Sequence, residues 1–254
     1  MKIDFQKAYD RMKWSFLLTT LKAFGFCEKF ISLIQQCLST INYTLLINGS
    51  HEAKINPSRG LRQGDPLSPY LFIIRSEVLA RLISREENKG TIRGVQLANR
   101  APAITKLFYA NDVMLFCNAK LSEVRTLLNC LDIYGKWFGQ IISVEKSVIF
   151  GSKGVYPDFL RQVKDQLGIK KLWHGTNYLG LPLFLSNNKA RDFSYVKEKM
   201  DARLACWKGK SLSWARRATL IKSVIQAIPN YTMSTFMLPR KINDKLDVDV
   251  RRFW

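Results

Sequence analysis

Cysteine and histidine are scarce in this 254-residue chain and too widely spaced to form a metal or disulfide framework. The chain contains five cysteines and two histidines, and no two cysteines form a CxxC pair. An odd number of scattered cysteines argues against a zinc site or paired disulfides and favours buried free thiols. The residues concerned are Cys27, Cys37, Cys117, Cys130, Cys206, His51 and His174.

Long hydrophobic runs are also absent. No segment reaches the roughly 18 apolar residues that a membrane helix needs. The first ten residues, MKIDFQKAYD, hold two acidic side chains where a secretory signal would be apolar. We therefore expect an intracellular protein, nuclear or cytoplasmic, with no membrane partner. No pattern in the sequence predicts an oligomeric state.

Acidic residues are few relative to basic ones. The chain has 40 Lys and Arg against 20 Asp and Glu, a formal net charge of +20. Such an excess repels itself unless a polyanion or an acidic surface lies nearby, and nucleic acid is therefore the expected partner. The excess is denser after residue 150, where 20 basic residues face 8 acidic ones.

The hydrophobic patterning divides the chain into two parts, which we place at 1–152 and 153–254. Helical and strand-like patterns alternate in the first part, and helical patterns dominate the second. Strands are expected at 2–5 and 144–150, with hairpins around Asn48-Gly49 and at an Asn111-Asp112 tip. Ser68 and Pro69 read as the N-cap and first residue of a helix over 70–83. Further helices are expected at 14–24, 28–38, 122–137, 159–167, 193–207, 214–228 (stopped by Pro229) and 242–253.

Four segments carry the residues of chemical interest: 2–14, 57–74, 106–116 and 142–152. Asp4 follows an apolar strand, and Asp112 lies at a hairpin tip. Carboxylates on rigid elements suit Mg²⁺, which takes hard oxygen ligands and shares its shell with substrate phosphates. In a strongly basic chain this favours phosphoryl transfer on nucleic acid. The same placement also fits ordinary solvated turn residues.

In their order along the chain and in their residues, the four segments resemble the palm of reverse transcriptases, most closely the plant non-LTR (LINE-type) retrotransposon enzymes. KIDFQKAYDRMKW resembles the first palm motif, RQGDPLSP lies within 57–74, KLFYANDVMLF resembles the catalytic hairpin, and ISVEKSVIFGS the lysine-bearing motif after it. YLGLPL at 178–183 and the stretch 206–239 resemble the region beyond the palm. The resemblance implies an α+β fold: an antiparallel palm sheet backed by helices over 1–152, then a mainly helical, thumb-like region over 153–254.

The resemblance also implies an activity and its partners. In this family the primer 3′-OH attacks the α-phosphorus of a deoxynucleoside triphosphate, while two Mg²⁺ ions stabilise the attacking and leaving oxygens. An RNA template, a DNA primer and deoxynucleoside triphosphates are the implied partners, and Mg²⁺ the implied cofactor.

Roles can be carried over to single positions. Asp4 matches a metal-binding aspartate, and the Phe5 carbonyl matches a backbone ligand beside it. Tyr9 matches a steric gate against the ribose 2′-OH, and packing at a helix start is its alternative. Lys146 matches a lysine that assists the leaving pyrophosphate, and a solvated strand-end charge is the alternative. Nucleotide and template contacts are implied for Arg62, Gln63 and Gly64, whereas Asp65 is expected to shape the loop.

The catalytic hairpin departs from the family at Asn111, where the first of two adjacent aspartates normally binds metal. Asparagine keeps one carbonyl oxygen but no charge, and a loss of about 3–5 kcal/mol would slow the reaction roughly 10²- to 10⁴-fold. We expect Asp112 not to replace it, because adjacent strand positions point to opposite faces. The implied catalytic set is Asp4, Asn111, Asp112 and Lys146; the implied metal ligands are Asp4, Phe5 and Asp112.

Met1 lies three residues before Asp4, so the fingers segment and any upstream endonuclease domain of the family are expected to be missing. The two departures predict an N-terminally truncated copy with no appreciable polymerisation, in which Asn111→Asp alone restores little. An active polymerase, a catalytically dead remnant and a retained nucleic-acid-binding module all stay open. Outside the family, the alternative is a basic helical protein that binds an acidic protein surface.

A second candidate site is the most basic stretch of the chain. Trp207 and Trp214 flank it and could pack below the cations or stack on bases. A solvated helix face is the alternative for each cation. The nucleic-acid-binding residues predicted here are Lys208, Lys210, Arg216, Arg217 and Lys222.

Overall fold

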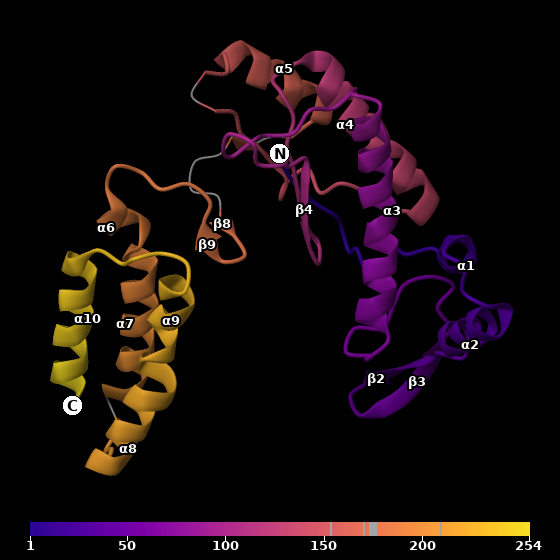
Figure 1. Ribbon diagram of the computed structural model, residues 1–254. Coiled ribbons are helices and arrows are strands. Elements are labelled where there is room, and N and C mark those ends of the chain that lie inside the picture. The colour runs from indigo at the N-terminus through magenta and orange to yellow at the C-terminus, as the bar shows by residue number, and fades with distance from the viewer. Residues whose placement is uncertain (153, 170, 173–176, 209) are drawn as a thin grey trace. The chain divides into compact units, whose positions relative to one another are not determined.

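The computed structural model describes all residues except 153, 170, 173–176 and 209 (Figure 1). The chain forms two compact units, Met1–Trp173 and His174–Trp254. This division falls later than the predicted 152/153 boundary, because α5 (Pro157–Leu167) and the segment after it belong to the first unit. Val163 and Ile169 are buried in the core of that unit, and β7 (Lys171–Leu172) joins its sheet. His174 lies outside the described residues.

A five-stranded sheet forms the centre of the first unit, in the order β4-β5-β1-β6-β7. The pairs β4–β5, β5–β1 and β1–β6 are antiparallel, and β6–β7 is parallel. The short strand β1 therefore lies between two antiparallel neighbours, and its Ile3 is fully buried. The strands are β1 (Lys2–Asp4), β4 (Lys106–Tyr109), β5 (Asp112–Leu115), β6 (Val148–Ile149) and β7 (Lys171–Leu172).

Helices supply most of the rest of this unit's core. Ile3 and Val113 from the sheet share one apolar cluster with Leu79 of α3 and Leu127 of α4. The long helix α3 packs against α1 and α4, and α1 packs against α2 (Figure 1). This antiparallel sheet backed by helices confirms the predicted α+β fold. The helices are α1 (Trp14–Ala23), α2 (Glu28–Ser39), α3 (Ser68–Asn88) and α4 (Leu121–Phe138).

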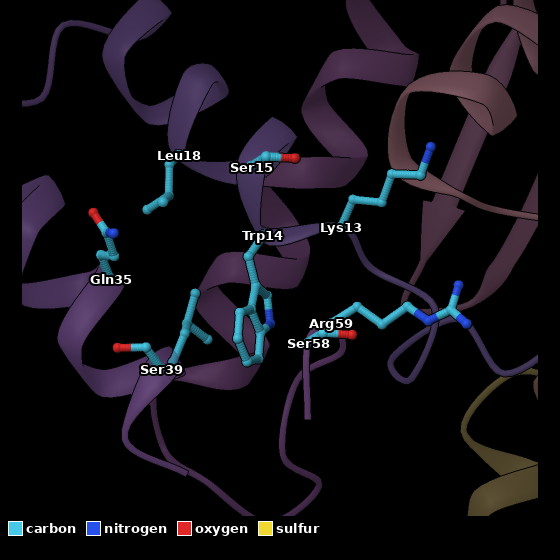
Figure 2. Close-up of a pocket in the computed structure, with 9 residues that line it drawn as sticks. Lys13, Trp14, Ser15, Leu18, Gln35, Ser39, Ser58 and Arg59 are labelled. Carbon is cyan, nitrogen blue, oxygen red and sulfur yellow. The ribbon is translucent and has the colours of Figure 1, made fainter. Parts of the chain in front are cut away.

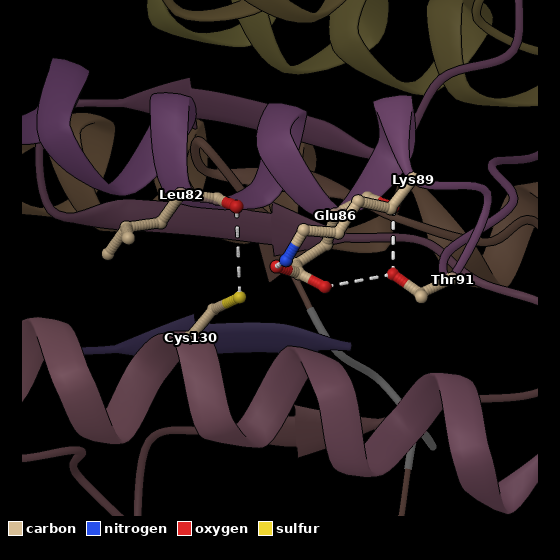
Figure 3. A network of polar contacts seen from close by, with 5 residues as sticks. All are labelled: Leu82, Glu86, Lys89, Thr91 and Cys130. Atoms are coloured by element: carbon tan, nitrogen blue, oxygen red, sulfur yellow. Dashed lines mark hydrogen bonds and ion pairs between the residues drawn. The ribbon is translucent and has the colours of Figure 1, made fainter.

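Polar contacts tie the end of α3 to its surroundings (Figure 3). The Glu86 carboxylate accepts from Lys89 Nζ at 2.6 Å and from Thr91 Oγ1 at 3.0 Å. The buried thiol of Cys130 on α4 lies 3.9 Å from the Leu82 carbonyl. These contacts fix where α3 ends and how the chain leaves it.

The hairpin β2 (Tyr43–Ile47) and β3 (Ser50–Ile55) forms at the predicted Asn-Gly turn. Asn48 and Gly49 have φ values of 50° and 87°, and a turn with positive φ at both central residues matches the strand twist. All eleven strand residues are exposed within this unit.

Three sequence-based expectations are wrong. Ser68 is not the N-cap: Leu67 precedes the helix, and Asp65 Oδ1 accepts from its backbone N–H at 3.1 Å. Asp65 therefore shapes the loop as predicted. Pro229 does not stop a helix but lies inside α9 (Ala227–Met233). The expected buried thiols are exposed at Cys27, Cys37 and Cys206, which lie at the start or on the outer faces of helices.

The second unit is mainly helical, as predicted. Its core brings together Phe193, Met200 on α7, Ile225 and Leu246 on α10. A π-helical turn (Ile221–Ile225) precedes Pro229, which has no N–H to donate to the carbonyl four residues earlier. The elements are β8 (Asn177–Tyr178), β9 (Leu181–Pro182), α6 (Lys189–Asp192), α7 (Ser194–Lys208), α8 (Trp214–Leu220), α9 (Ala227–Met233) and α10 (Arg240–Phe253). Across the described residues of both units, none of the helices is long and apolar enough to span a membrane.

Candidate active site

Two carboxylates meet where β1 ends and β5 begins. Asp4 and Asp112 are direct partners in the antiparallel ladder, one register step from the pair Ile3 and Val113. Directly opposed residues project to the same side of a sheet. Since Ile3 and Val113 are buried in the core, Asp4 and Asp112 share the other face. The structure thus brings together the two acids that the sequence predicts as metal ligands.

The charges around Asp4 oppose one another. Burial raises the pKa of the Asp4 carboxyl, and the nearby Asp112 raises it further, whereas Lys146 and Lys2 lower it. Lys2 Nζ lies 3.1 Å from Asp112 Oδ1, with both side chains at least three-quarters buried. The two acids of this face are therefore partly offset by the Lys2 ion pair with Asp112 and by the effect of Lys146 on Asp4.

The turn of the catalytic hairpin lies one residue earlier than the predicted Asn111-Asp112 tip. Tyr109 pairs with Asp112, so Ala110 and Asn111 form the turn and Asp112 is already on β5. Ala110 has a φ of +49°, an uncommon value for a residue with a side chain. Because Asn111 is in the turn, strand alternation does not decide how its side chain lies relative to that of Asp112, and the reason for expecting that Asp112 cannot replace it does not apply.

Asn111 Oδ1 is buried and has no hydrogen-bond partner. A buried acceptor without a donor costs free energy, and a cation beside it would remove that cost. Amide and carboxylate oxygens are both hard donors of the kind that Mg²⁺ takes. The described residues contain no cluster of three or more His, Cys, Asp or Glu side chains that could hold a metal ion.

A loop after α4 holds the backbone of Asp4. Ser143 N donates to the Asp4 carbonyl at 2.8 Å, and the Asp4 N–H donates to Ser147 Oγ at 3.1 Å. Phe5 and Ile142 form an isolated antiparallel β-bridge. The carbonyls of Asp4 and Ile141 accept the two hydrogen bonds of this bridge, so the Phe5 carbonyl accepts neither of them. Ser147 was not recognised from sequence, although it lies in the lysine-bearing segment next to the exposed Lys146.

Ser147→Ala should lower the free energy of unfolding by about 1–2 kcal/mol, because it leaves the Asp4 N–H without its buried acceptor. Urea denaturation with an unchanged m-value is the measurement. Ser122→Ala, which removes an exposed hydroxyl at the start of α4, is the control and should stay within about 0.5 kcal/mol of the parent. Equal stabilities for the two variants would contradict this role of Ser147.

Tyr9 lies in the turn between β1 and α1, and not at a helix start. Its ring stacks on Phe72 with centroids 4.6 Å apart and planes at 15°, and the side chain stays half-exposed. Leu61 N donates to the Tyr9 carbonyl at 2.9 Å, and Gly60 N donates to the Met12 carbonyl at 2.8 Å. A Cβ on Gly60 would meet the Asp10 carbonyl at 2.8 Å, so only glycine permits this approach.

The predicted nucleotide loop begins at this contact. Arg62, Gln63 and Gly64 follow Leu61 directly, and all three are exposed. Gly64 has a φ of +89° and open space where a Cβ would stand. The loop is therefore tied to the turn that carries Tyr9, and it presents a backbone that a ligand could approach closely.

A cavity of about 470 Å³ lies on the other side of the same loop, between α1 and α2 (Figure 2). Trp14 is one of the residues that line it, and its Nε1 donates to the Gly60 carbonyl at 2.6 Å. No local sequence pattern predicts this cavity, because its lining residues come from three separate segments. They are Lys13, Trp14, Ser15, Leu18, Gln35, Leu38, Ser39, Ser58 and Arg59.

The predicted basic patch divides into cations with different surroundings. Lys210, Arg216 and Lys222 are exposed, and the side chain of Lys208 lies outside the described part of the chain. Arg217 is engaged instead: its Nη1 donates to the Phe253 and Trp254 carbonyls at 3.4 and 3.0 Å.

The two tryptophans of this patch also differ. Trp207 packs toward Phe253, with ring centroids 5.8 Å apart, whereas Trp214 is 65% exposed beside Trp254. The Arg217 guanidinium lies 5.7 Å from the Trp214 ring. Trp207 therefore packs in the unit, and Trp214 is the ring available to a ligand.

Residues 1–183 match the family model of reverse transcriptases (RNA-dependent DNA polymerases). The match covers most of the chain and includes every element that builds the Asp4–Asp112 site. The chain therefore belongs to the reverse transcriptase family.

Its relatives include proteins of mobile elements. The chain is 26% identical over 230 residues to an uncharacterized 149 kDa protein of transposon TX1 from Xenopus laevis, covering 89% of this chain and 17% of that protein. It is 28% identical over 152 residues to the retrovirus-related Pol polyprotein of the type-2 retrotransposable element R2DM from Drosophila melanogaster, covering 60% and 14%. An uncharacterized mitochondrial protein of Arabidopsis thaliana is 49% identical over 67 residues, covering 26% and 55%.

The chain thus spans little more than half of one of these relatives and under a fifth of the other two. The family match and the retrotransposon relatives confirm the resemblance that the four motifs predict.

Proposed function

We propose that the face shared by Asp4 and Asp112 is the nucleotidyl-transfer site of an RNA-directed DNA polymerase domain, and that Asn111 impairs it. The direct register of Asp4 with Asp112 carries this proposal. Asp4, Asp112, Asn111 Oδ1 and the Phe5 carbonyl would hold Mg²⁺, which when bound neutralises charge that develops on phosphate oxygens. Tyr9 lies beside the sugar of the incoming nucleotide, and Lys146 faces its phosphates.

The chain's own residues mainly position and neutralise. Ser143 and Ser147 orient Asp4, and the contacts of Gly60 and Leu61 hold the loop of Arg62, Gln63 and Gly64 against the Tyr9 turn. With Asn111 in place of an aspartate, the site has one negative charge fewer with which to attract a divalent cation. Impaired chemistry follows from this missing charge.

Primer extension on a homopolymer RNA template tests the proposal. We expect no appreciable product from the wild-type chain with Mg²⁺, and little from Asn111→Asp alone. In a version that carries the segment upstream of the palm from a relative, Asn111→Asp should raise the rate roughly 10²- to 10⁴-fold, and an added Asp4→Asn should abolish it. Efficient extension by the wild-type chain would contradict the proposed impairment.

A second function, binding of nucleic acid without catalysis, is favoured by the exposed cations Lys210, Arg216 and Lys222. Such binding depends on distributed charge and not on a single carboxylate, so it can persist when catalysis is lost. The exposed ring of Trp214 adds a surface on which a base can stack.

The binding affinity should depend steeply on salt. If about five phosphates are neutralised, the slope of log affinity against log salt is near −3.5 for single strands. Replacing Lys210, Arg216 and Lys222 together by alanine should reduce its magnitude by about two. Arg161→Ala removes a cation already paired with Asp158 and is the control that should leave the slope unchanged. Affinity that is indifferent to salt would rule this function out.

A further inference from the structure

Arg75 is a buried cation inside the first unit. It lies on α3 with 1% of its surface exposed, and no carboxylate of the described residues pairs with it. Its Nη1 donates to the Ala8 carbonyl at 3.0 Å, while its buried Nε has no partner. The guanidinium carbon lies 3.9 Å from the centre of the Phe72 ring, 5.6 Å from that of Tyr134 and 5.9 Å from that of Phe5. Aromatic faces therefore provide most of its stabilisation.

A second buried donor reaches the same oxygen. Gln140 Nε2 donates to the Ala8 carbonyl at 3.2 Å, from the segment just after α4. The backbone of Gln140 packs closely against Gly135, because a Cβ at Gly135 would lie only 2.8 Å from the Gln140 carbonyl oxygen. The two donors can satisfy both lone pairs of the Ala8 carbonyl. One buried oxygen thus joins the β1–α1 turn to α3 and to the end of α4.

The turn held in this way carries Tyr9, the residue after Ala8. Phe72 contacts both the Tyr9 ring and the Arg75 guanidinium. Arg75 therefore acts on Tyr9 in two ways. It donates to the carbonyl of Ala8, the residue before Tyr9, and it contacts the Phe72 ring on which the Tyr9 ring stacks. Lys7, in the same turn, has a φ of +46°, so the turn is strained and requires such restraint.

We infer that Arg75 is a positioning residue that fixes the Tyr9 ring and thereby sets the preference for 2′-deoxynucleotides over ribonucleotides. This inference rests on the proposed function, in which Tyr9 lies beside the sugar. A rigid ring excludes a hydroxyl that a mobile ring would accommodate, because a steric gate works only as well as its position is held. An unpaired buried cation is a costly way to hold a turn, and the hydrogen bond that it donates goes to the Ala8 carbonyl of this turn.

The test compares Arg75→Met, which removes both charge and donor at similar length, with Arg75→Lys, which keeps the charge. Arg81→Met is the matched control, since Arg81 lies on the exposed side of the same helix. Hydrogen exchange is measured at the amides of Gly60 and Leu61, whose bonds to Met12 and Tyr9 report on the turn. We expect at least tenfold faster exchange in Arg75→Met, an intermediate effect in Arg75→Lys and none in Arg81→Met. Unchanged exchange in Arg75→Met would overturn the positioning role.

Nucleotide preference is measured by equilibrium binding of dATP and ATP with Mg²⁺. The wild-type chain should bind dATP about tenfold more tightly than ATP, and Arg75→Met should reduce this ratio at least threefold. An unchanged ratio in Arg75→Met, despite faster exchange, would overturn the effect on selectivity. If the wild-type chain binds neither nucleotide, the proposed function fails and the selectivity fails with it. The exchange rates still decide whether Arg75 holds the turn.

Discussion

Asn111→Asp should raise the affinity of the Asp4–Asp112 face for Mg²⁺ by roughly 10- to 100-fold, about 1.4–2.8 kcal/mol. Lys2 pairs with Asp112 and Lys146 acts on Asp4, so the charge of the two acids is already partly offset, and a new carboxylate adds one further negative charge. Attraction between this charge and a divalent ion at about 4 Å amounts to several kcal/mol, and desolvation and repulsion among the acids offset much of it. Calorimetric titration with Mg²⁺ measures the change.

Asn48→Asp is the matched control for this experiment. It adds the same charge to the exposed β2–β3 turn, where Asn48 has positive φ and aspartate is tolerated. Its affinity for Mg²⁺ should equal that of the wild-type chain. Without metal, Asn111→Asp should also be less stable by about 1–2 kcal/mol, because it places a like charge beside Asp112, and Mg²⁺ should restore the loss. An affinity no higher than that of Asn48→Asp would refute this assignment of Asn111.

Arg75→Met should raise the free energy of unfolding by about 1–3 kcal/mol. Burial lowers the pKa of the Arg75 guanidinium, the direction expected when the cost of removing a charge from water is not fully repaid. The substitution removes this cost, and Gln140 still donates to the Ala8 carbonyl that Arg75 leaves. The variant also loses the contact of the guanidinium with the Phe72 ring, and this loss lowers the gain in stability by about 2 kcal/mol at most. The midpoint of urea denaturation is the measurement.

Two further variants test whether the removal of the buried charge causes the gain in stability of Arg75→Met. Arg75→Lys keeps a buried cation with fewer donors and should be no more stable than the wild-type chain. Arg81→Met removes an arginine that is exposed and paired with Glu77, and it should change stability by about 0.5 kcal/mol or less. If Arg75→Met is destabilised as much as a core truncation, the guanidinium contributes net stability and the prediction is wrong.

The four motifs predicted more of the site than of the packing that supports it. Asp4 and Asp112 were assigned from short segments more than a hundred residues apart, and the structure places them in direct register. Ser147 and Arg75 were missed. Each acts through a hydrogen bond to a backbone group far away in the sequence: Ser147 to the Asp4 N–H, and Arg75 to the Ala8 carbonyl. No local pattern distinguishes such a serine or arginine from any other.

Local patterns also failed where a single residue mattered. Periodicity located the catalytic hairpin, but the turn lies at Ala110 and Asn111, one residue earlier than expected. Pairing of Tyr109 with Asp112 sets this register, and no local pattern contains it. Arg217 looked like its neighbour Arg216, yet the carbonyls at the end of α10 engage only Arg217.

Motif order, composition and charge were sufficient for the family, the α+β class and the pair of acids, because these depend on which residues the chain contains. The alternation of strand and helix patterns and the Asn-Gly hairpin belong to the same group, since short-range backbone preferences govern them. The face that Asp112 shares with Asp4, the orphaned Asn111 oxygen and the buried Arg75 required the tertiary structure. Each depends on contacts between segments far apart in sequence, and such contacts form and contribute free energy only in the folded chain.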